Sequence, residues 1–314
     1  MKHVFIFDPK SFQKQPWKMD IVLDGIGQYF SRIENPDFSI LISRYRRHAI
    51  FLIQKQIEEA GEGNTVRVYA AGGNEILYDC LNGIAGLPGA ELAFISYDIS
   101  SDFFRFYGEE KKESFRDISS LAEAPAVQTD IIAAGSSYAL NTCFVGLPSA
   151  ISVKTKDIAW KYNNMPLIGS LSAVLKKLLV SQQYKVTIDD NDYSGNYSFI
   201  NIANGPYYAG RKTAMAHAIP DDGMLDVALM ESAAPLKTYG SMRKYFSGKK
   251  PGNCIILRAK KISIQSNEPM WLQLDSEFSR NSSITFEVVP AAVQIVAAND
   301  LKDGLNGPMG RSGQ

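Results

Sequence analysis

Apolar positions in the first third of the chain alternate between short continuous runs and longer stretches with helical spacing. The short runs predict strands over residues 3–7, 38–43, 66–71 and 91–96. Between them, apolar side chains recur every three or four residues, as in residues 44–60, and that stretch ends at Gly61. Strands that alternate with helices predict a parallel sheet with helices on both faces.

From about Thr129 onward the pattern becomes mainly β, with short alternating segments that continue to about Ala298. Residues 188–196 separate two such segments and predict a hairpin connection. Helical spacing returns only in residues 167–180 and 236–246. We therefore expect an α/β domain over residues 1–125 and an antiparallel β-sandwich or barrel-like domain over residues 126–298. Residues 299–314 form a tail that either packs back on the first domain or is disordered.

Composition narrows the class of protein. The chain has 314 residues, more than one hydrophobic core usually holds, and its formal net charge is zero. A neutral chain gives no support to bulk nucleic-acid binding. Its three cysteines and three histidines are scattered, which predicts buried thiols in a cytoplasmic protein. No apolar run is long enough for a signal peptide or a membrane span, so we expect any contact with a membrane to be peripheral.

One stretch carries a candidate site, the segment VRVYAAGGNEILYDCLNG over residues 66–83. A strand that runs into Gly72 and Gly73 and then into a helix is the layout of a phosphate-binding loop. Taken alone, the two glycines indicate no more than a structural turn.

Other landmarks, in the same order, extend the argument over residues 4–295. AAGGNEILYDCLNGI is similar to a GGDGT-LNEVLNGL block, and ISYDISSDFFRFYG is similar to an IPLGTGNDFARxLG block. The segments DPKSF, SRYRRHA, NGPYYAG, PDDGMLDV and LQLDSE match further blocks. Together they resemble the catalytic family of diacylglycerol kinases, bacterial lipid kinases related to sphingosine kinases. That family combines an α/β domain like that of NAD kinase with a β-sandwich domain, in agreement with the pattern above.

The resemblance implies a site. Lipid kinases of this family transfer the γ-phosphate of ATP to a lipid hydroxyl with Mg²⁺, and a carboxylate accepts the hydroxyl proton. Carried over, Glu277 is the general base and Asp275 its motif partner, although a polar strand end also explains LDSE. The phosphates would lie against Ser43, Gly72, Gly73, Asn74, Glu75, Ile76 and Asp102.

The resemblance also implies a cation site at the PDDG turn. Its ligands would be Asp222 and the main-chain oxygens of Ile219 and Met224, an all-oxygen set that suits Mg²⁺ or Ca²⁺. The same residues favour a tight turn without any metal.

The departures from the family fall on the nucleotide side. Asn74, Glu75 and Ile76 replace the last three residues of GGDGT, and residues 98–101 replace the start of GTGND. The GFDA segment reads GLPSA without its carboxylate, and Phe12 replaces an opening glycine. A negative charge beside phosphates costs on the order of 1 to 4 kcal/mol. We therefore expect weak ATP binding.

Three functions follow from these observations. The first is an ATP-dependent kinase of diacylglycerol or a similar lipid alcohol, peripheral to the inner face of a membrane. The second is a catalytically impaired relative that binds lipid or a partner protein, and the third is a kinase with another phosphoryl donor. The basic stretch 237–261, which lacks Asp and Glu, suits either anionic lipid headgroups or a solvated surface. The sequence does not decide between a monomer and a homodimer.

Overall fold

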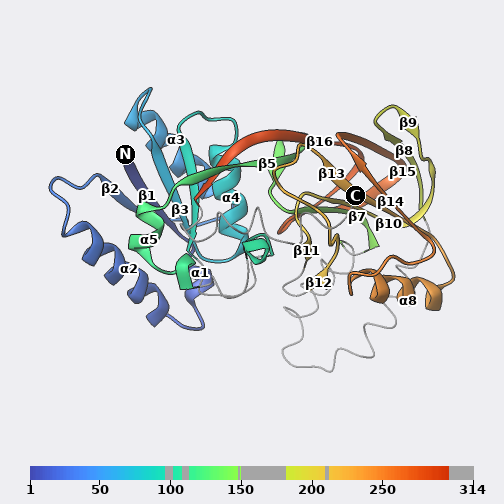
Figure 1. Cartoon of the computed structure of the whole chain (residues 1–314), viewed down its shortest axis with the longest axis horizontal. Helices are drawn as coiled ribbons and strands as arrows, with labels where there is room; N and C mark the ends of the chain where they lie inside the picture. Colours follow the sequence, from blue (N-terminus) through green and yellow to red (C-terminus); the bar gives the residue numbers. More distant parts are fainter. Residues whose placement is uncertain (96–101, 108–112, 148, 150–181, 209–211, 297–314) are drawn as a thin grey trace. The chain divides into compact units, whose positions relative to one another are not determined.

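The computed structural model describes residues 1–95, 102–107, 113–147, 149, 182–208 and 212–296. The chain forms two compact units (Figure 1). Unit 1 comprises Met1–Ile131 and the described residues from Pro290 onward, and unit 2 comprises Ile132–Val289. The division therefore falls a few residues after the predicted boundary at residue 125, and the return of the chain to unit 1 at Pro290 has no signal in the sequence pattern. The helix predicted over residues 167–180, the 98–101 block and the tail from residue 299 lie outside the described residues.

A parallel sheet forms the centre of unit 1. Its strands are β1 (Lys2–Phe7), β2 (Phe38–Ile42), β3 (Val66–Ala71) and β4 (Ala90–Ile95), in the order β4-β3-β1-β2. The last residues of β16 (Glu277–Val296) pair in parallel with β4 through Gln294 and Ile295. Every residue of β3 and β4 is buried, which explains their continuous apolar runs and confirms the predicted parallel sheet.

Helices cover this sheet. They are α1 (Pro9–Phe12), α2 (Trp17–Phe30), α3 (His48–Ala60), α4 (Asn74–Ile84) and α5 (Ile118–Glu123), with a 3₁₀ turn, η1, over Phe104–Tyr107. Helix α2 packs with α5, and α3 packs with α4. Across the sheet, the step from β1 to β2 runs in one direction and the step from β2 to β3 runs in the opposite direction. Because such crossovers are right-handed, α2 and α3 lie on opposite faces of the sheet.

One helix boundary differs from the prediction. Helix α3 begins at His48 and not at Arg44, because Arg47 adopts a left-handed conformation with φ of 64°. The preceding residues form a loop in which the backbone N–H of Arg44 donates a hydrogen bond to Nδ1 of His48 at 3.1 Å. The helical spacing of residues 44–60 carried no signal for this local interruption.

A buried polar cluster holds the amino-terminal half of the unit 1 sheet. The guanidinium of Arg67 pairs with Glu91 at 2.7 Å and donates to the main-chain oxygens of Leu121 and Ala122. Nδ1 of His3 lies 2.7 Å from the hydroxyl of Tyr69, and burial lowers the pKa of His3 to about 4. These groups bind one another, so we assign them a structural role.

Unit 2 is mainly antiparallel, as predicted. Its pairings are those of β5 with β6, β10 with β7, β8 and β13, β13 with β14, and β15 with β7, β8 and β16. The short strand β9 pairs with β8, and β11 pairs with β12. The bounds are β5 (Ala126–Ala134), β6 (Ser137–Ala139), β7 (Thr142–Gly146), β8 (Gln182–Ile188), β9 (Asn191–Asp192), β10 (Gly195–Ala203), β11 (Tyr207–Tyr208), β12 (Lys212–Thr213), β13 (Leu225–Glu231), β14 (Cys254–Ala259) and β15 (Lys261–Leu274).

Two long strands give unit 2 its barrel-like closure. Strand β10 pairs with β8 at its start and with β7 further on, and β15 does the same. Each register shifts midway, between Tyr197 and Phe199 in β10 and between Gln265 and Met270 in β15. Such bulges bend a strand from one sheet into the next. The segments KISIQ and WLQL are therefore two parts of one long strand, β15.

Helix α8 (Pro235–Tyr245) covers an aromatic core in unit 2. Its Tyr245, with the adjacent Phe246, packs against Phe144, Phe199 and Tyr208. All three cysteines are buried thiols, as expected. In the described part of the chain, no helix is both long and apolar enough to cross a membrane.

Candidate functional site

The Gly-Gly loop lies where the unit 1 sheet reverses its strand order. Strand β1 separates β2 from β3, so the loops that leave β1 and β3 diverge at their carboxyl ends. Open α/β sheets bind ligands in the crevice at such a point. The loop after β3 contains Gly72 and Gly73, and Gly73 is the N-cap of α4. The sequence-predicted phosphate loop therefore has the position and the helix N-terminus that anion binding requires.

The backbone conformation and the neighbouring atoms at position 72 both require glycine. The φ of Gly72 is 151°, and a Cβ atom there would lie 3.0 Å from both Cγ2 of Ile76 and Oγ of Ser11. Ile76 is buried against this turn, so it replaces a hydroxyl residue of the family by a packing contact. The loop keeps its glycine geometry while one of its polar side chains has become part of the core.

The loop after β1 is joined directly to the Gly-Gly loop. The N–H of Gly73 donates to Oγ of Ser11 at 3.0 Å, and Ser11 donates to Oδ2 of Asp8 at 2.7 Å. Asp8 in turn caps α1 through the N–H of Lys10. The sequence identified DPKSF only as a family landmark. The structure gives Asp8 and Ser11 a role that the sequence did not predict, because they fix the turn at the start of α4.

A third loop, residues 43–47, follows β2 at the same edge. Ser43 is buried, and its N–H donates to the main-chain oxygen of Phe7 at 2.8 Å. Arg44, Arg46 and Arg47 are exposed in this loop. Their guanidinium groups make this edge of the sheet basic, which favours an anionic ligand.

Asp79 connects this basic loop to α4. Its carboxylate accepts the N–H of Arg47 at 2.8 Å. Burial raises the pKa of Asp79, the charges of Arg47 and Arg46 lower it, and the charge of Glu75 raises it. Glu75 therefore lies within electrostatic range of the same carboxylate as the two arginines. Asp79 was not predicted as a site residue, although its place one turn after Glu75 on the helix was a usable signal.

Glu75 and Asn74 occupy the first turn of α4. The side chain of Glu75 is exposed and that of Asn74 is half-buried. A carboxylate in the first turn stabilises a helix through its dipole. The same dipole would attract phosphate, so Glu75 competes with an anionic ligand for this end of α4. Asp102 is half-buried in the turn before η1, and residues 98–101 lie outside the described residues.

In unit 2, Asp275 forms the turn between β15 and β16. Its Oδ2 accepts the N–H of Leu140 at 2.6 Å, and its Oδ1 accepts the N–H groups of Asn141 and Thr142 at 3.0 and 2.9 Å. The N–H of Asp275 donates to the main-chain oxygen of Thr142 at 2.9 Å. Its φ of 49° is a conformation that Asp and Asn tolerate. Asp275 therefore anchors the turn to the start of β7.

Glu277 is the first residue of β16, two residues after Asp275. It pairs in register with Leu274 across the hairpin, and its side chain is half-buried. The anchor at Asp275 fixes the backbone that leads to Glu277. The hydrogen bonds thus assign the Asp275 carboxylate to the turn, and Glu277 begins β16 two residues later.

The motif NGPYYAG packs on the same anchor segment. The N–H of Asn204 donates to the main-chain oxygen of Asn141 at 2.8 Å, and its Nδ2 donates to that of Leu140 at 2.8 Å. A Cβ on Gly205 would lie 2.1 Å from Oδ1 of Asn141, so only glycine fits there. Residues 140–142 therefore join two family motifs. Strand β6 ends before Leu140 and β7 begins at Thr142, and the N–H groups of these three residues bind Asp275.

Asp222 in the PDDG turn has a basic side chain as its partner. Oδ1 of Asp222 accepts the N–H of Met224 at 3.0 Å, and Oδ2 forms an ion pair with Arg258. Ile219 and Met224 are half-buried on either side of the turn. The oxygen donors suit a hard cation in type, but such a cation would compete with the guanidinium. Within the described residues, no group of three His, Cys, Asp or Glu side chains is placed to bind a metal ion.

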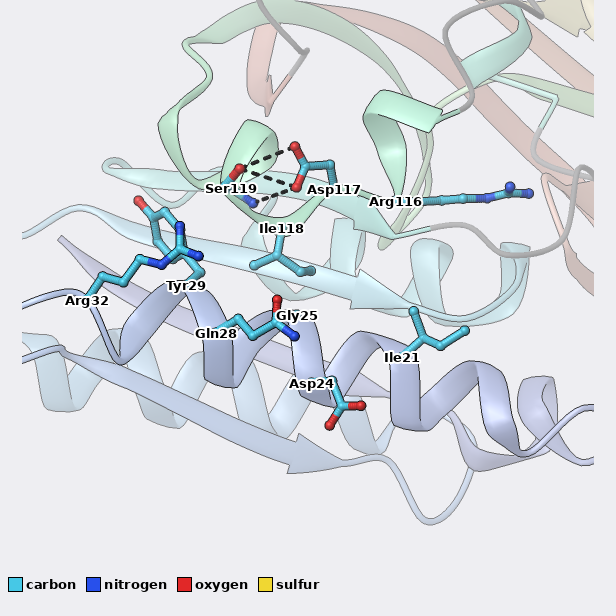
Figure 2. A pocket seen from close by; sticks show the side chains of 10 residues that line it. All are labelled: Ile21, Asp24, Gly25, Gln28, Tyr29, Arg32, Arg116, Asp117, Ile118 and Ser119. Atoms are coloured by element: carbon cyan, nitrogen blue, oxygen red, sulfur yellow. Dashed lines mark hydrogen bonds between the residues drawn. The ribbon is translucent and has the colours of Figure 1, made fainter.

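Unit 1 also has a hollow whose lining residues do not come from the loops described above. It has a volume of about 440 Å³ between α2 and the start of α5, and Figure 2 shows its side chains. Asp117 lines it but serves as the N-cap of α5, and the hydrogen bond from Ser120 is the main reason that the pKa of Asp117 is lowered. None of the predicted site residues lines this hollow.

Most of the predicted residues therefore fall into three groups. Unit 1 gathers the loops after β1, β2 and β3, and unit 2 gathers the LDSE and NGPYY segments on residues 140–142. The PDDG turn forms a separate group with Arg258 and Asp226. Burial raises the pKa of Asp226 to about 6.

Known proteins match this arrangement. Residues 142–297 match the family model described as the YegS C-terminal NAD kinase beta sandwich-like domain. A "Putative lipid kinase" of Staphylococcus aureus (strain bovine RF122 / ET3-1) is 31% identical over 185 residues, which cover 55% of this chain and 57% of that protein. Its counterpart in strain JH9 is 30% identical over the same length. The match thus spans little more than half the length of these relatives.

Solved structures show the same fold over nearly the whole chain. A "putative diacylglycerol kinase" from Bacillus anthracis str. Sterne superposes with a TM-score of 0.72 at 20% identity, covering 96% of this chain and 98% of the other. A second structure, described as a diacylglycerol kinase of the same organism, gives a TM-score of 0.67 at 18% identity. The domain match, the lipid-kinase relatives and the shared fold agree with the motifs. Residues 142–297 therefore belong to the family of the YegS C-terminal NAD kinase beta sandwich-like domain, and the chain is similar to bacterial lipid kinases.

Proposed function

We propose that this protein transfers the γ-phosphate of ATP to the hydroxyl of a lipid alcohol such as diacylglycerol. The observation that carries the proposal is the division of roles in the Asp275 turn. Asp275 accepts three backbone N–H groups, so its oxygens serve the fold. Glu277, held two residues further on, is the carboxylate that we assign as the proton acceptor.

The proposed donor site is the edge of the unit 1 sheet. Gly72 and Gly73 allow close approach of a phosphate to the backbone at the N-terminus of α4, and Ser43, Asn74, Glu75, Ile76 and Asp102 complete the proposed surroundings. The exposed arginines of residues 43–47 offset negative charge there. Bound Mg²⁺ would neutralise charge on the phosphates. The cation proposed at Asp222, with the main-chain oxygens of Ile219 and Met224, would have to displace the guanidinium of Arg258.

A second candidate is a catalytically impaired relative that binds lipid without phosphorylating it. It is favoured by Ile76, whose buried side chain replaces a hydroxyl, and by the charge of Glu75 at the helix N-terminus. The two candidates make the same lipid contact but differ in the nucleotide, so ATP binding and product formation distinguish them.

The direct experiment uses purified protein, labelled ATP, Mg²⁺ and mixed micelles that contain diacylglycerol or another lipid alcohol. Phosphorylated lipid is the expected product, and Glu277→Gln should reduce its rate by about 100-fold or more, because general-base catalysis contributes about 10²–10⁴-fold. The variant should unfold at the same temperature as the parent protein. Equal rates for the two proteins, or no product from either, would contradict the proposal. ATP binding without product would favour the impaired relative.

A further inference from the structure

Helix α8 has an inner face that the fold explains and an outer face that it does not. Thr238, Ser241 and Tyr245 are buried, and Tyr245 belongs to the aromatic core of unit 2. The helix lies at the edge of that unit in Figure 1. Met242 also packs against this core, whereas Leu236, Lys237, Tyr239, Arg243 and Lys244 are exposed and need a separate explanation.

Two large side chains project from the outer face. Leu236 is 84% exposed and Tyr239 is 55% exposed, and their spacing of three residues places them on the same side of the helix. Leu236 is the most exposed of the large hydrophobic side chains in the described residues. Leucine and aromatic side chains are residue types that enter the interface of a membrane.

Basic side chains accompany this apolar pair. Lys237, Arg243 and Lys244 are exposed on α8, and Lys249 and Lys250 are exposed in the loop that follows. Among the described residues, none of these five forms an ion pair. No Asp or Glu occurs between Ser232 and Asn267. The surface therefore has a local positive charge in a chain whose formal net charge is zero.

A hollow of about 650 Å³ lies beside the basic side of α8. Lys237, Gly240, Ser241 and Lys244 line it along the helix, at the spacing of one helical stripe. Gly240 leaves open space between the two lysines, because a Cβ there would meet no atom within 4 Å. Pro251, Gly252 and Asn253 form the opposite wall, and Glu231 adds one carboxylate. Two ammonium groups on either side of a gap suit a phosphate headgroup.

We propose that the outer face of α8 docks on an anionic lipid surface. Leu236 and Tyr239 enter the boundary between headgroups and acyl chains, and Lys237 and Lys244 bind a headgroup phosphate, while Arg243, Lys249 and Lys250 face neighbouring headgroups. The inference rests on the proposed function, because a kinase of a lipid alcohol must reach its substrate at a membrane. The combination of exposed apolar pair and unpaired basic stripe favours lipid over an acidic protein partner.

The test measures co-sedimentation with phosphatidylcholine vesicles that contain either no phosphatidylglycerol or about one third of it, without ATP. We expect binding only to the anionic vesicles, weaker at high salt. Lys237→Glu/Lys244→Glu should weaken it by roughly 30-fold or more, since each basic side chain near an anionic surface contributes strongly. Lys185→Glu/Lys261→Glu, with the same change in net charge, should bind nearly as the parent does. Glu231→Gln should bind more tightly, because it removes the negative charge from the hollow.

The apolar contribution has its own variant. Leu236→Ser/Tyr239→Ser should weaken vesicle binding while leaving the salt dependence in place, and its unfolding temperature should not fall. Equal weakening by the Lys185→Glu/Lys261→Glu control, or no binding of the parent protein to anionic vesicles, would overturn the proposal. Binding to an acidic polypeptide at equal strength would indicate a protein partner and would also overturn it.

Failure of this inference is distinguishable from failure of the proposed function. Kinase activity in detergent micelles without vesicle binding would reject α8 as a docking surface and leave the kinase assignment intact. Vesicle binding without kinase activity in any lipid would reject the kinase and leave the docking surface intact.

Discussion

Two turns of this molecule carry family motifs, and they have diverged in different ways. In the turn between β15 and β16, Asp275 keeps its carboxylate and uses it to accept three backbone N–H groups. In the loop between β3 and α4, Gly72 and Gly73 keep the backbone, while the next three residues have changed. Residues that hold a turn together persist in both places. The positions that would touch a phosphate have changed. Glu75 is exposed at the surface of the loop, and Ile76 is buried in the core.

These two turns show that a sequence motif can keep its backbone structure whether or not it still binds a ligand or acts on a substrate. The Gly-Gly turn is fixed by packing against Ser11 and Ile76, so it would persist without any nucleotide. The Asp275 turn is likewise fixed by its hydrogen bonds, whether or not Glu277 acts on a substrate. Substitutions in each turn can therefore separate a role in stability from a role in binding or catalysis.

The largest effect on stability should come from Asp275→Asn. Asparagine tolerates the positive φ, so the change isolates the carboxylate. One acceptor oxygen becomes an NH₂ group that faces N–H donors, which leaves buried donors unsatisfied and should lower the free energy of unfolding by about 2–4 kcal/mol. Urea denaturation measures it. Glu268→Gln, at an exposed position of the same unit, should change stability by less than about 0.5 kcal/mol. Similar values for the two variants would mean that the turn does not depend on Asp275.

Gly72→Ala makes the matching change in unit 1. The new methyl group would lie 3.0 Å from Ile76 and Ser11 in a backbone conformation that alanine disfavours. We expect a loss of about 1–3 kcal/mol in thermal or urea unfolding, typical of an overpacked site. Gly27→Ala, where no atom lies within 4 Å of the new Cβ and the residue is helical, should be neutral or stabilising. A neutral Gly72→Ala would show that the loop is not held by this packing.

Asp226 provides a contrast with Asp275 within unit 2. Burial raises its pKa to about 6, above the usual value of 3.8. The fold therefore favours the protonated carboxyl, and that contribution is fully present below pH 4 and is lost as the pH rises through 6. Asp226→Asn should raise stability at pH 7 by about 1–3 kcal/mol, and the gain should disappear near pH 4. A gain that does not vary with pH between 4 and 7 would contradict this assignment.

Much of the fold follows from the sequence because long periodic segments dominate it. The continuous apolar runs of β1, β3 and β4 predicted buried parallel strands, and the stripe of α8 predicted a helix. The sequence did not reveal the late start of α3, since the left-handed Arg47 depends on a contact with Asp79 from another helix. It also did not reveal the break between β6 and β7 at residues 140–141, because Asp275 lies more than 130 positions away in the chain. Local patterns predict local structure, and these two features are fixed by partners distant in sequence.

The candidate site follows the same rule. Its motifs were recognisable as blocks, and the structure forms a turn at both the Gly-Gly segment and the LDSE segment, while their roles in a site stay predictions. The supporting residues Asp8, Ser11, Asp79 and Asn141 were missed, because their roles arise from hydrogen bonds between loops. The Arg258 partner of Asp222 was missed for the same reason, and it changes the expectation for the PDDG turn.

The smallest expected effect is the most direct test of the central claim, that the unit 1 loop keeps its phosphate-binding backbone and is weakened by one charge. Isothermal calorimetry would measure the affinity of Mg²⁺-ATP for the parent protein, for Glu75→Gln and for Glu62→Gln, an exposed carboxylate at the other end of β3. We expect Glu75→Gln to bind ATP about 3- to 10-fold more tightly, because about 1 kcal/mol of repulsion is removed. We expect Glu62→Gln to leave the affinity unchanged. Unchanged or weaker binding by Glu75→Gln would contradict the claim.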